Sequence, residues 1–165
     1  MLPDFVRKYL LAALAGTPDV LEGFLKAVPD TDPVWDFRPD PERFTLREVI
    51  AHLADWEPIF LERMRRIQKE TDPALPSYDE GQFVLDRDYA HQSPQANLVR
   101  FREGRTRMAA FLCSVDPADW QRTGRYFRQE DKGDPITLEG WLAEVVGHDG
   151  YHTQQVALWL AAGRH

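Results

Sequence analysis

The stretch TLEGWLAEVVGHDGYHTQQVALWLAAG, residues 137–163, has the pattern of one long amphipathic helix. Thr137 is placed to cap its first turn, and Gly163 is placed to end it. Its apolar face is built at spacings of three and four from Leu138, Trp141, Val145, Val156 and Trp159. His148 and His152 fall on the same face, so both rings should point inward about one turn apart.

Helical periodicity predicts three more long helices, separated by connectors rich in proline and aspartate. The first covers about residues 3–28, with a break or kink at GTPD (16–19), where Thr17 can cap and Pro18 fits a first turn. The second runs from Thr45 to about residue 69; Thr45 and Glu48 match a capping box, and Phe44 occupies the position of a hydrophobic staple.

Pro58 should kink the second helix, and Ser93 should cap the third, with Pro94 in its first turn. Residues 78–91 are consistent with a short extra helix, and no segment shows the alternation of a strand. The sequence therefore predicts an all-α fold, a four-helix bundle with a long proline-rich first connector at 29–44, as a single domain over 1–165.

Composition narrows the classes of partner and compartment. A net charge of −7 argues against a nucleic-acid partner, and the arginines at 63, 65 and 66 and at 100, 102, 105 and 107 are interpreted as solvated helix faces. The single cysteine, Cys113, excludes an intramolecular disulfide and a thiolate metal cluster, and its apolar neighbours favour burial. With no signal pattern and no apolar run of membrane-spanning length, a cytoplasmic protein with no membrane association is expected.

A third histidine, His52, falls on the inward line of the second helix with Val49 and Trp56. One histidine from that helix and two from the last can converge inside a bundle, where metal sites are commonly built from facing helices. Three neutral imidazoles with an open fourth position suit a catalytic divalent metal. The other interpretation, histidines that are hydrogen-bonded within the core, stays open on spacing alone.

These residues resemble the DinB-like (YfiT-type) metalloproteins over nearly the whole chain. The segments FTLREVIAHLADWE (44–57) and EVVGHDGYHTQQV (144–156) match the family's second and last helices, and Trp35 and DPADW (116–120) fit its layout. The resemblance implies one divalent metal on His52, His148 and His152, zinc or nickel by preference, manganese or iron as alternatives. It also implies hydrolases or thiol-dependent transferases, acting on a small molecule or a low-molecular-weight thiol, and a homodimer.

Several neighbours could accept the free ring N–H of a ligating histidine: Asp55, Glu144, Asp149 and Gln155. Tyr151 and Gln154 should lie on the outer face of the last helix. Trp56 and Trp141 should either pack in the core or form walls of the pocket. His91 lies in a polar segment and His165 at the chain end, so neither is expected at the site.

Two functional hypotheses follow. In the first, a metal on the three histidines activates water or a small thiol; because no general base stands out in the sequence, thiol transfer is slightly favoured over hydrolysis. In the second, the metal only stabilises a helical bundle that serves as a stress-related binding module. A solvent-accessible pocket at the histidines would favour the enzyme, and a site closed by a fourth protein ligand would favour the structural role.

Overall fold

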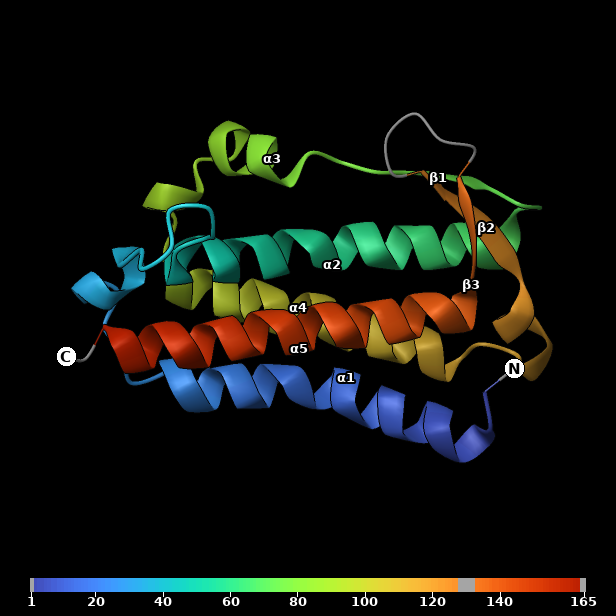
Figure 1. Ribbon diagram of the computed structural model, residues 1–165. Helices are drawn as coiled ribbons and strands as arrows, with labels where there is room; N and C mark the ends of the chain where they lie inside the picture. The colour runs from blue at the N-terminus through green and yellow to red at the C-terminus, as the bar shows by residue number, and fades with distance from the viewer. Residues whose placement is uncertain (1, 128–132, 164–165) are drawn as a thin grey trace.

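Four long helices lie side by side in the computed structural model, which describes residues 2–127 and 133–163 (Figure 1). They are α1 (Asp4–Leu25), α2 (Leu46–Lys69), α4 (Pro94–Cys113) and α5 (Leu138–Ala162). The connector between α1 and α2 contains the short 3-10 helix η1 (Pro33–Asp36). The predicted four-helix bundle is therefore confirmed, with the second helix ending at the expected residue.

Consecutive helices do not pair as hairpins. Around the bundle α1 contacts α4 and α5, and α2 contacts the same two helices, so α1 and α2 occupy one diagonal and α4 and α5 the other. In Figure 1, α1 runs in the same direction as α5 and opposite to α2 and α4. The connection from α2 back to the start of α4 therefore returns along the bundle, and it carries β1 (Ala74–Pro76), α3 (Glu80–Asp86) and the 3-10 helix η2 (Tyr89–His91).

The helix starts follow from their capping residues. Thr45 accepts from the backbone N–H of Glu48, whose carboxylate accepts in turn from the Thr45 N–H, so the predicted capping box is present. Ser93 and Thr137 accept from backbone N–H groups in the first turns of α4 and α5, as predicted. These side chains satisfy donors that have no partner inside a helix.

Residues 16–19 do not break the first helix, because α1 is one helix through Pro18. Thr17 does not cap a turn; its hydroxyl donates to the carbonyl of Ala13 and to Asp149 of α5. Pro18 has no N–H for the carbonyl of Leu14, and that carbonyl accepts instead from Arg105 of α4 at 2.7 Å. The helix α2 likewise continues through Pro58.

A three-stranded sheet lies at the end of the bundle where α2 finishes and α5 begins (Figure 1). Its strands are β1, β2 (Thr123–Phe127) and β3 (Asp134–Thr137). The 3-10 helix η3 (Pro117–Gln121) lies between α4 and β2. Strand β2 pairs parallel with β1 and antiparallel with β3. The prediction of helices alone was wrong here, because strands of three to five residues are too short to show alternation. The extra helix expected within residues 78–91 is present as α3 and η2.

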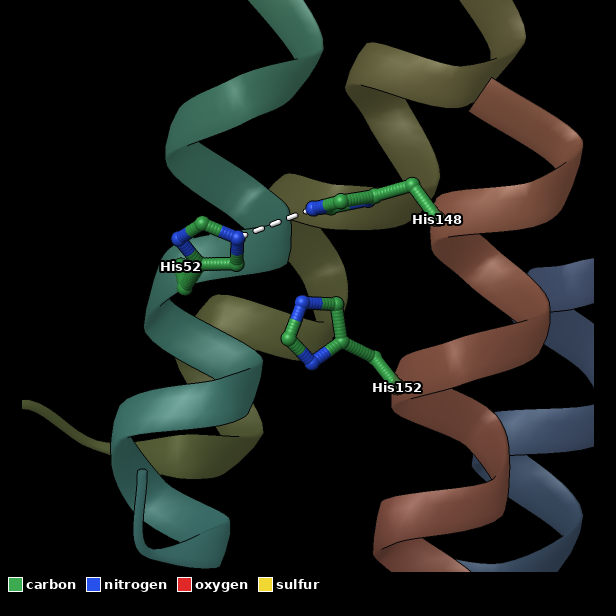
Figure 2. A group of neighbouring side chains, drawn as sticks. All are labelled: His52, His148 and His152. Carbon is green, nitrogen blue, oxygen red and sulfur yellow. Dashed lines mark hydrogen bonds between the residues drawn. The ribbon is translucent and has the colours of Figure 1, made fainter. Parts of the chain in front are cut away.

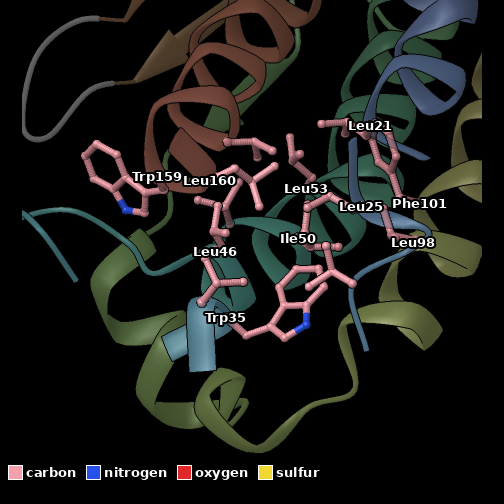
Figure 3. Close-up of a cluster of buried hydrophobic side chains, with 14 of the residues drawn as sticks. Leu21, Leu25, Trp35, Leu46, Ile50, Leu53, Leu98, Phe101, Trp159 and Leu160 are labelled. Atoms are coloured by element: carbon pink, nitrogen blue, oxygen red, sulfur yellow. The ribbon is translucent and has the colours of Figure 1, made fainter. Parts of the chain in front are cut away.

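The core consists of two apolar clusters with a polar layer between them. One cluster lies at the end of the bundle that holds the start of α2, and includes Leu25, Trp35, Ile50 and Phe101 (Figure 3). The other surrounds Phe60, Met64 and Trp141. The charged and imidazole side chains between them are fully or nearly buried: His52, Glu57, Arg105, Asp149 and His152.

Two interpretations of individual side chains were wrong. Cys113 is exposed rather than buried, because it falls on the outer side of the last turn of α4. Arg63 and Arg105 are buried rather than solvated: Arg63 lies among the rings of Trp56, Tyr78, Tyr126 and Trp141, and Arg105 lies in the polar layer. In the described part of the chain, no helix combines the length and apolar character needed to cross a membrane.

Candidate metal centre

The three predicted histidines come together between α2 and α5 (Figure 2). His52 projects from α2, and His148 and His152 project from successive turns of α5. The Nε2 atoms of His52 and His148 are 2.9 Å apart, and one nitrogen from each of the three rings lies within 4.8 Å of the others. Four-coordinate zinc at about 2.0–2.1 Å would separate its ligand nitrogens by roughly 3.3 Å, which falls between these values.

The rings are uncharged at neutral pH because they are buried. Burial lowers the pKa of His148 to about 4 and that of His152 to about 3, and it places the pKa of His52 well below its usual value. Mutual repulsion adds to the effect at His52 and His152, and Arg105 adds to it at His148. Neutral imidazole is the form that binds a metal ion.

Gln155 fixes the orientation of His152. The amide nitrogen of Gln155 donates to the carbonyl of Phe44 at 2.8 Å, so its oxygen faces His152 Nδ1, 3.3 Å away. That contact favours the tautomer with the proton on Nδ1 and leaves Nε2 free. Of the four residues considered for this role, Gln155 is the one that contacts a ring of the triad.

The residues present fit a divalent ion. The Nδ1 atoms of His52 and His148 are buried without a hydrogen-bond partner, and the two rings face each other through Nε2. With a proton on one Nε2 the two rings share a hydrogen bond, and with both Nε2 atoms unprotonated a divalent ion between the rings would satisfy the two lone pairs. In the described ranges no cysteine or carboxylate joins the three histidines as a fourth ligand.

The other three candidates have different partners. Asp55 accepts from Arg87, which follows α3, and from Arg100 in the first half of α4, and Glu144 is exposed. Asp149 points away from the rings and pairs with Arg105. The prediction that these residues support the histidines is therefore wrong, although their helical spacing allowed it.

Arg105 connects all four helices next to the site. It donates from α4 to Glu57 of α2 at 2.6 Å, to Asp149 of α5 at 2.9 Å, and to the carbonyl of Leu14 of α1. Thr17 of α1 also donates to Asp149, which immediately follows His148. This buried network fixes the position of α5 against the other helices, and with it the two histidines on α5.

A cavity of about 260 Å³ reaches the histidines from solvent. His148, His152 and Gln155 line it together with five other residues: Glu42, Arg43, Phe44, Glu80 and Tyr151. The sequence did not single out Arg43 or Glu80, because Arg43 lies on a connector and Glu80 on the seven-residue helix α3, whose positions depend on the fold. Partial burial raises the pKa of the Glu80 carboxyl group, although the residue as a whole is exposed.

The aromatic and remaining histidine candidates also have defined places. Trp56 packs against His52, with ring centroids 5.5 Å apart, whereas Trp141 contacts Phe60 and lies in the core; neither lines the cavity. Tyr151 is exposed, as predicted, yet it stacks edge-on against His152. His91 is exposed and bonds to Asp88, so its absence from the site agrees with the prediction, and His165 lies outside the described residues.

Comparison with known proteins agrees with this geometry. YfiT of Bacillus subtilis (strain 168), named as a candidate metal-dependent hydrolase, is 28% identical over 113 residues, which are 68% of this chain and 62% of YfiT. A solved structure of YfiT, described as a probable metal-dependent hydrolase with an unusual four-helix bundle topology, matches 96% of this chain and 88% of its own with a TM-score of 0.87 at 23% identity. The family model of the DinB superfamily matches residues 13–156. The chain therefore belongs to the DinB superfamily.

Proposed function

We propose that this protein is a metal-dependent hydrolase whose divalent ion, zinc or nickel by preference, is held by His52, His148 and His152. The observation that carries the proposal is a triad of neutral imidazoles of which two, His148 and His152, line a solvent-accessible cavity. Such a donor set leaves coordination positions for water and substrate, and the described residues supply no fourth ligand to close it.

A bound divalent ion would supply a Lewis acid that polarises a carbonyl group and acidifies water. The chain contributes the other elements. His152, held through Nδ1 by Gln155, keeps its Nε2 lone pair turned towards the other two rings. Trp56, Phe44 and Phe60 pack against rings of the triad, so the histidines lie in largely apolar surroundings. Charges that develop there during a reaction are less screened than they would be in solution.

Glu80 supplies the general base that sequence reasoning could not identify. Its carboxylate belongs to the same cavity wall as His148 and His152, and its raised pKa brings it closer to neutrality than an ordinary glutamate. A base with such a pKa can accept a proton from attacking water through an Oε atom and return it to the leaving group. The reason for preferring thiol transfer was the missing base, so Glu80 moves the preference to hydrolysis of a small amide or ester.

The test begins with metal content. The protein is purified without a nickel column, and the parent is compared with His52→Ala, His148→Ala and the matched control His91→Ala. We expect about one equivalent of metal in the parent and in His91→Ala, and none in the other two. A parent that neither contains nor takes up a divalent ion would rule out the proposal.

Activity is then measured on the metal-loaded protein with small amide and ester substrates. Glu80→Gln should retain the metal and lower kcat about 10²–10⁴-fold, the usual contribution of a general base. Full metal content with no hydrolysis of any substrate class would instead favour the metal-stabilised binding module. Hydrolysis that is unaffected by Glu80→Gln would exclude Glu80 as the base.

We also propose a homodimer, for which α1 provides a self-complementary face. Four large apolar side chains on one side of α1 are exposed: Phe5, Tyr9, Val20 and Phe24. Ala12, Ala13 and Gly16 lie between them and line a groove of about 600 Å³ between α1 and α5. Small residues at the centre of such a stripe allow two helices to approach closely.

The order of these residues favours a second copy of the chain as the occupant. If two α1 helices cross antiparallel with Ala13 opposite Gly16, then Tyr9 lies opposite Val20 and Phe5 opposite Phe24. The same register brings the exposed Lys8 beside Asp19 of the second copy, whose charge is opposite. A two-fold axis requires such a palindromic face.

Cysteine cross-linking tests this register. In a Cys113→Ser background, Ala13→Cys and Gly16→Cys are prepared separately; no atom lies within 4 Å of a Cβ at Gly16, so the monomer tolerates the change. Under oxidation, a mixture of the two variants should cross-link faster than either alone. Light scattering that shows a monomer, or equal cross-linking in all three samples, would contradict this interface.

A further inference from the structure

Arg43 is a cation without a protein anion at the entrance to the metal cavity. Its side chain belongs to the cavity wall with His148 and His152. Within the described residues it forms no ion pair, and its Nε atom is buried without a hydrogen-bond partner. A buried donor of a charged group that lacks a partner is costly unless a ligand satisfies it.

The fold holds the Arg43 guanidinium in one place. It lies 4.8 Å from the ring centre of Tyr151 and 5.0 Å from that of Trp159, and Trp159 is itself anchored by a hydrogen bond to the carbonyl of Phe44. Arg38 donates to the backbone carbonyl of Arg43 at 2.8 Å. Because Nε is buried and the guanidinium stacks on two rings, its two terminal Nη groups form the edge that a ligand can reach.

The two acids of the cavity wall, Glu42 and Glu80, are not within ion-pair distance of Arg43. A planar guanidinium with a free edge matches a carboxylate, which it can bind through two parallel hydrogen bonds. The cavity of about 260 Å³ limits the ligand to a small molecule.

We infer that Arg43 binds the carboxylate of the substrate, so that the enzyme acts on small carboxylic acids that carry a hydrolysable amide or ester near the acid group. This inference rests on the proposed metal-dependent hydrolase, because the ion on the histidine triad would have to bind the carbonyl end of the same molecule. N-acylated amino acids and half-amides of short dicarboxylic acids have this chemistry. Tyr151 and Trp159 act as positioning residues by holding the guanidinium.

Two hydroxamates distinguish binding by the metal from binding by Arg43. Acetohydroxamate can chelate a metal ion but has no carboxylate, and the monohydroxamate of succinate has both groups. Their dissociation constants are measured by calorimetry on the zinc-loaded parent, Arg43→Met, Arg43→Lys and the control Arg107→Met, which removes an exposed arginine remote from this cavity. Metal content and melting temperature are measured for each protein.

In the parent and in Arg107→Met, we expect the carboxylate probe to bind about 10–100-fold more tightly than acetohydroxamate. Arg43→Met should abolish this preference without weakening acetohydroxamate, and Arg43→Lys should keep part of it. Equal binding of the two probes to the parent would overturn the role of Arg43 and leave the metal site intact. Binding of neither probe, with no zinc retained, would overturn both proposals.

Discussion

Acid should destabilise the metal-free protein through its buried histidines, and the size of the effect follows from their pKa values. In the unfolded chain each histidine titrates near pH 6.5, whereas burial holds the pKa at about 4 for His148 and about 3 for His152. The unfolded state therefore binds more protons below pH 6.5, so stability falls as the pH falls. The loss continues until the pH reaches the folded-state values, near pH 4 and pH 3.

Between pH 7 and pH 5 each ring that stays neutral in the folded state costs about 2 kcal/mol, so the pair costs about 4 kcal/mol. That is a large share of a typical folding free energy of about 5–15 kcal/mol. His52, whose pKa is also well below its usual value, acts in the same direction. Glu57 and Glu80 act in the opposite direction, because burial raises the pKa of each.

The assay is urea unfolding with a chelator present, at pH 7, 6 and 5. Because the glutamates oppose the histidines, the informative quantity is the difference between the parent and a His148→Gln/His152→Gln double variant. The double variant should lose about 4 kcal/mol less than the parent between pH 7 and pH 5. His91→Gln, which removes an exposed histidine, should behave as the parent. Equal losses in the parent and the double variant would refute the view that the rings are neutral and buried.

Three further changes test the packing around the site. Arg105→Met leaves two buried carboxylates unpaired and should lower the unfolding free energy by about 3–5 kcal/mol in urea titrations; a loss below 1 kcal/mol would contradict its central position. Gly104→Ala should cost about 1–3 kcal/mol, because its Cβ would lie 2.5 Å from Glu57 Cβ, whereas Gly23→Ala, with open space around it, should be neutral or stabilising by up to about 1 kcal/mol. Gln155→Leu frees His152 and should weaken zinc affinity about 10–100-fold in a competition titration against a chromophoric chelator; unchanged affinity would show that the amide does not orient the ring.

The sequence was sufficient for the parts of the fold that depend on local chemistry. Capping residues such as Thr45 and Thr137 act within one turn, so the helix starts were predictable. The inward direction of His52, His148 and His152 follows from helical periodicity, which is also local. The convergence of the three rings required both the bundle geometry and the resemblance to a known family.

The features that escaped prediction depend on partners far away in the chain. Strand β1 exists only because residues 74–76 pair with 125–127, and no local pattern encodes that pairing. Arginine spacing suggested solvated faces, but Arg105 is buried because its partners on three other helices neutralise it and occupy its donors. Pro18 was expected to distort α1, and the donor that satisfies the carbonyl it leaves free comes from α4.

The diagonal placement of consecutive helices also constrains how the chain reaches this structure. Helical bundles usually fold within microseconds to milliseconds because most of their contacts are local. Here the contacts that join neighbouring antiparallel helices link residues far apart in the chain: Leu14 and Arg105 are 91 positions apart, and His52 and His148 are 96. Large loops must close before these contacts form, so folding should be slow for a helical protein. During synthesis on the ribosome, α1 and α2 have no long helix of the bundle beside them until α4 has emerged, and the histidine triad can assemble only when α5 follows.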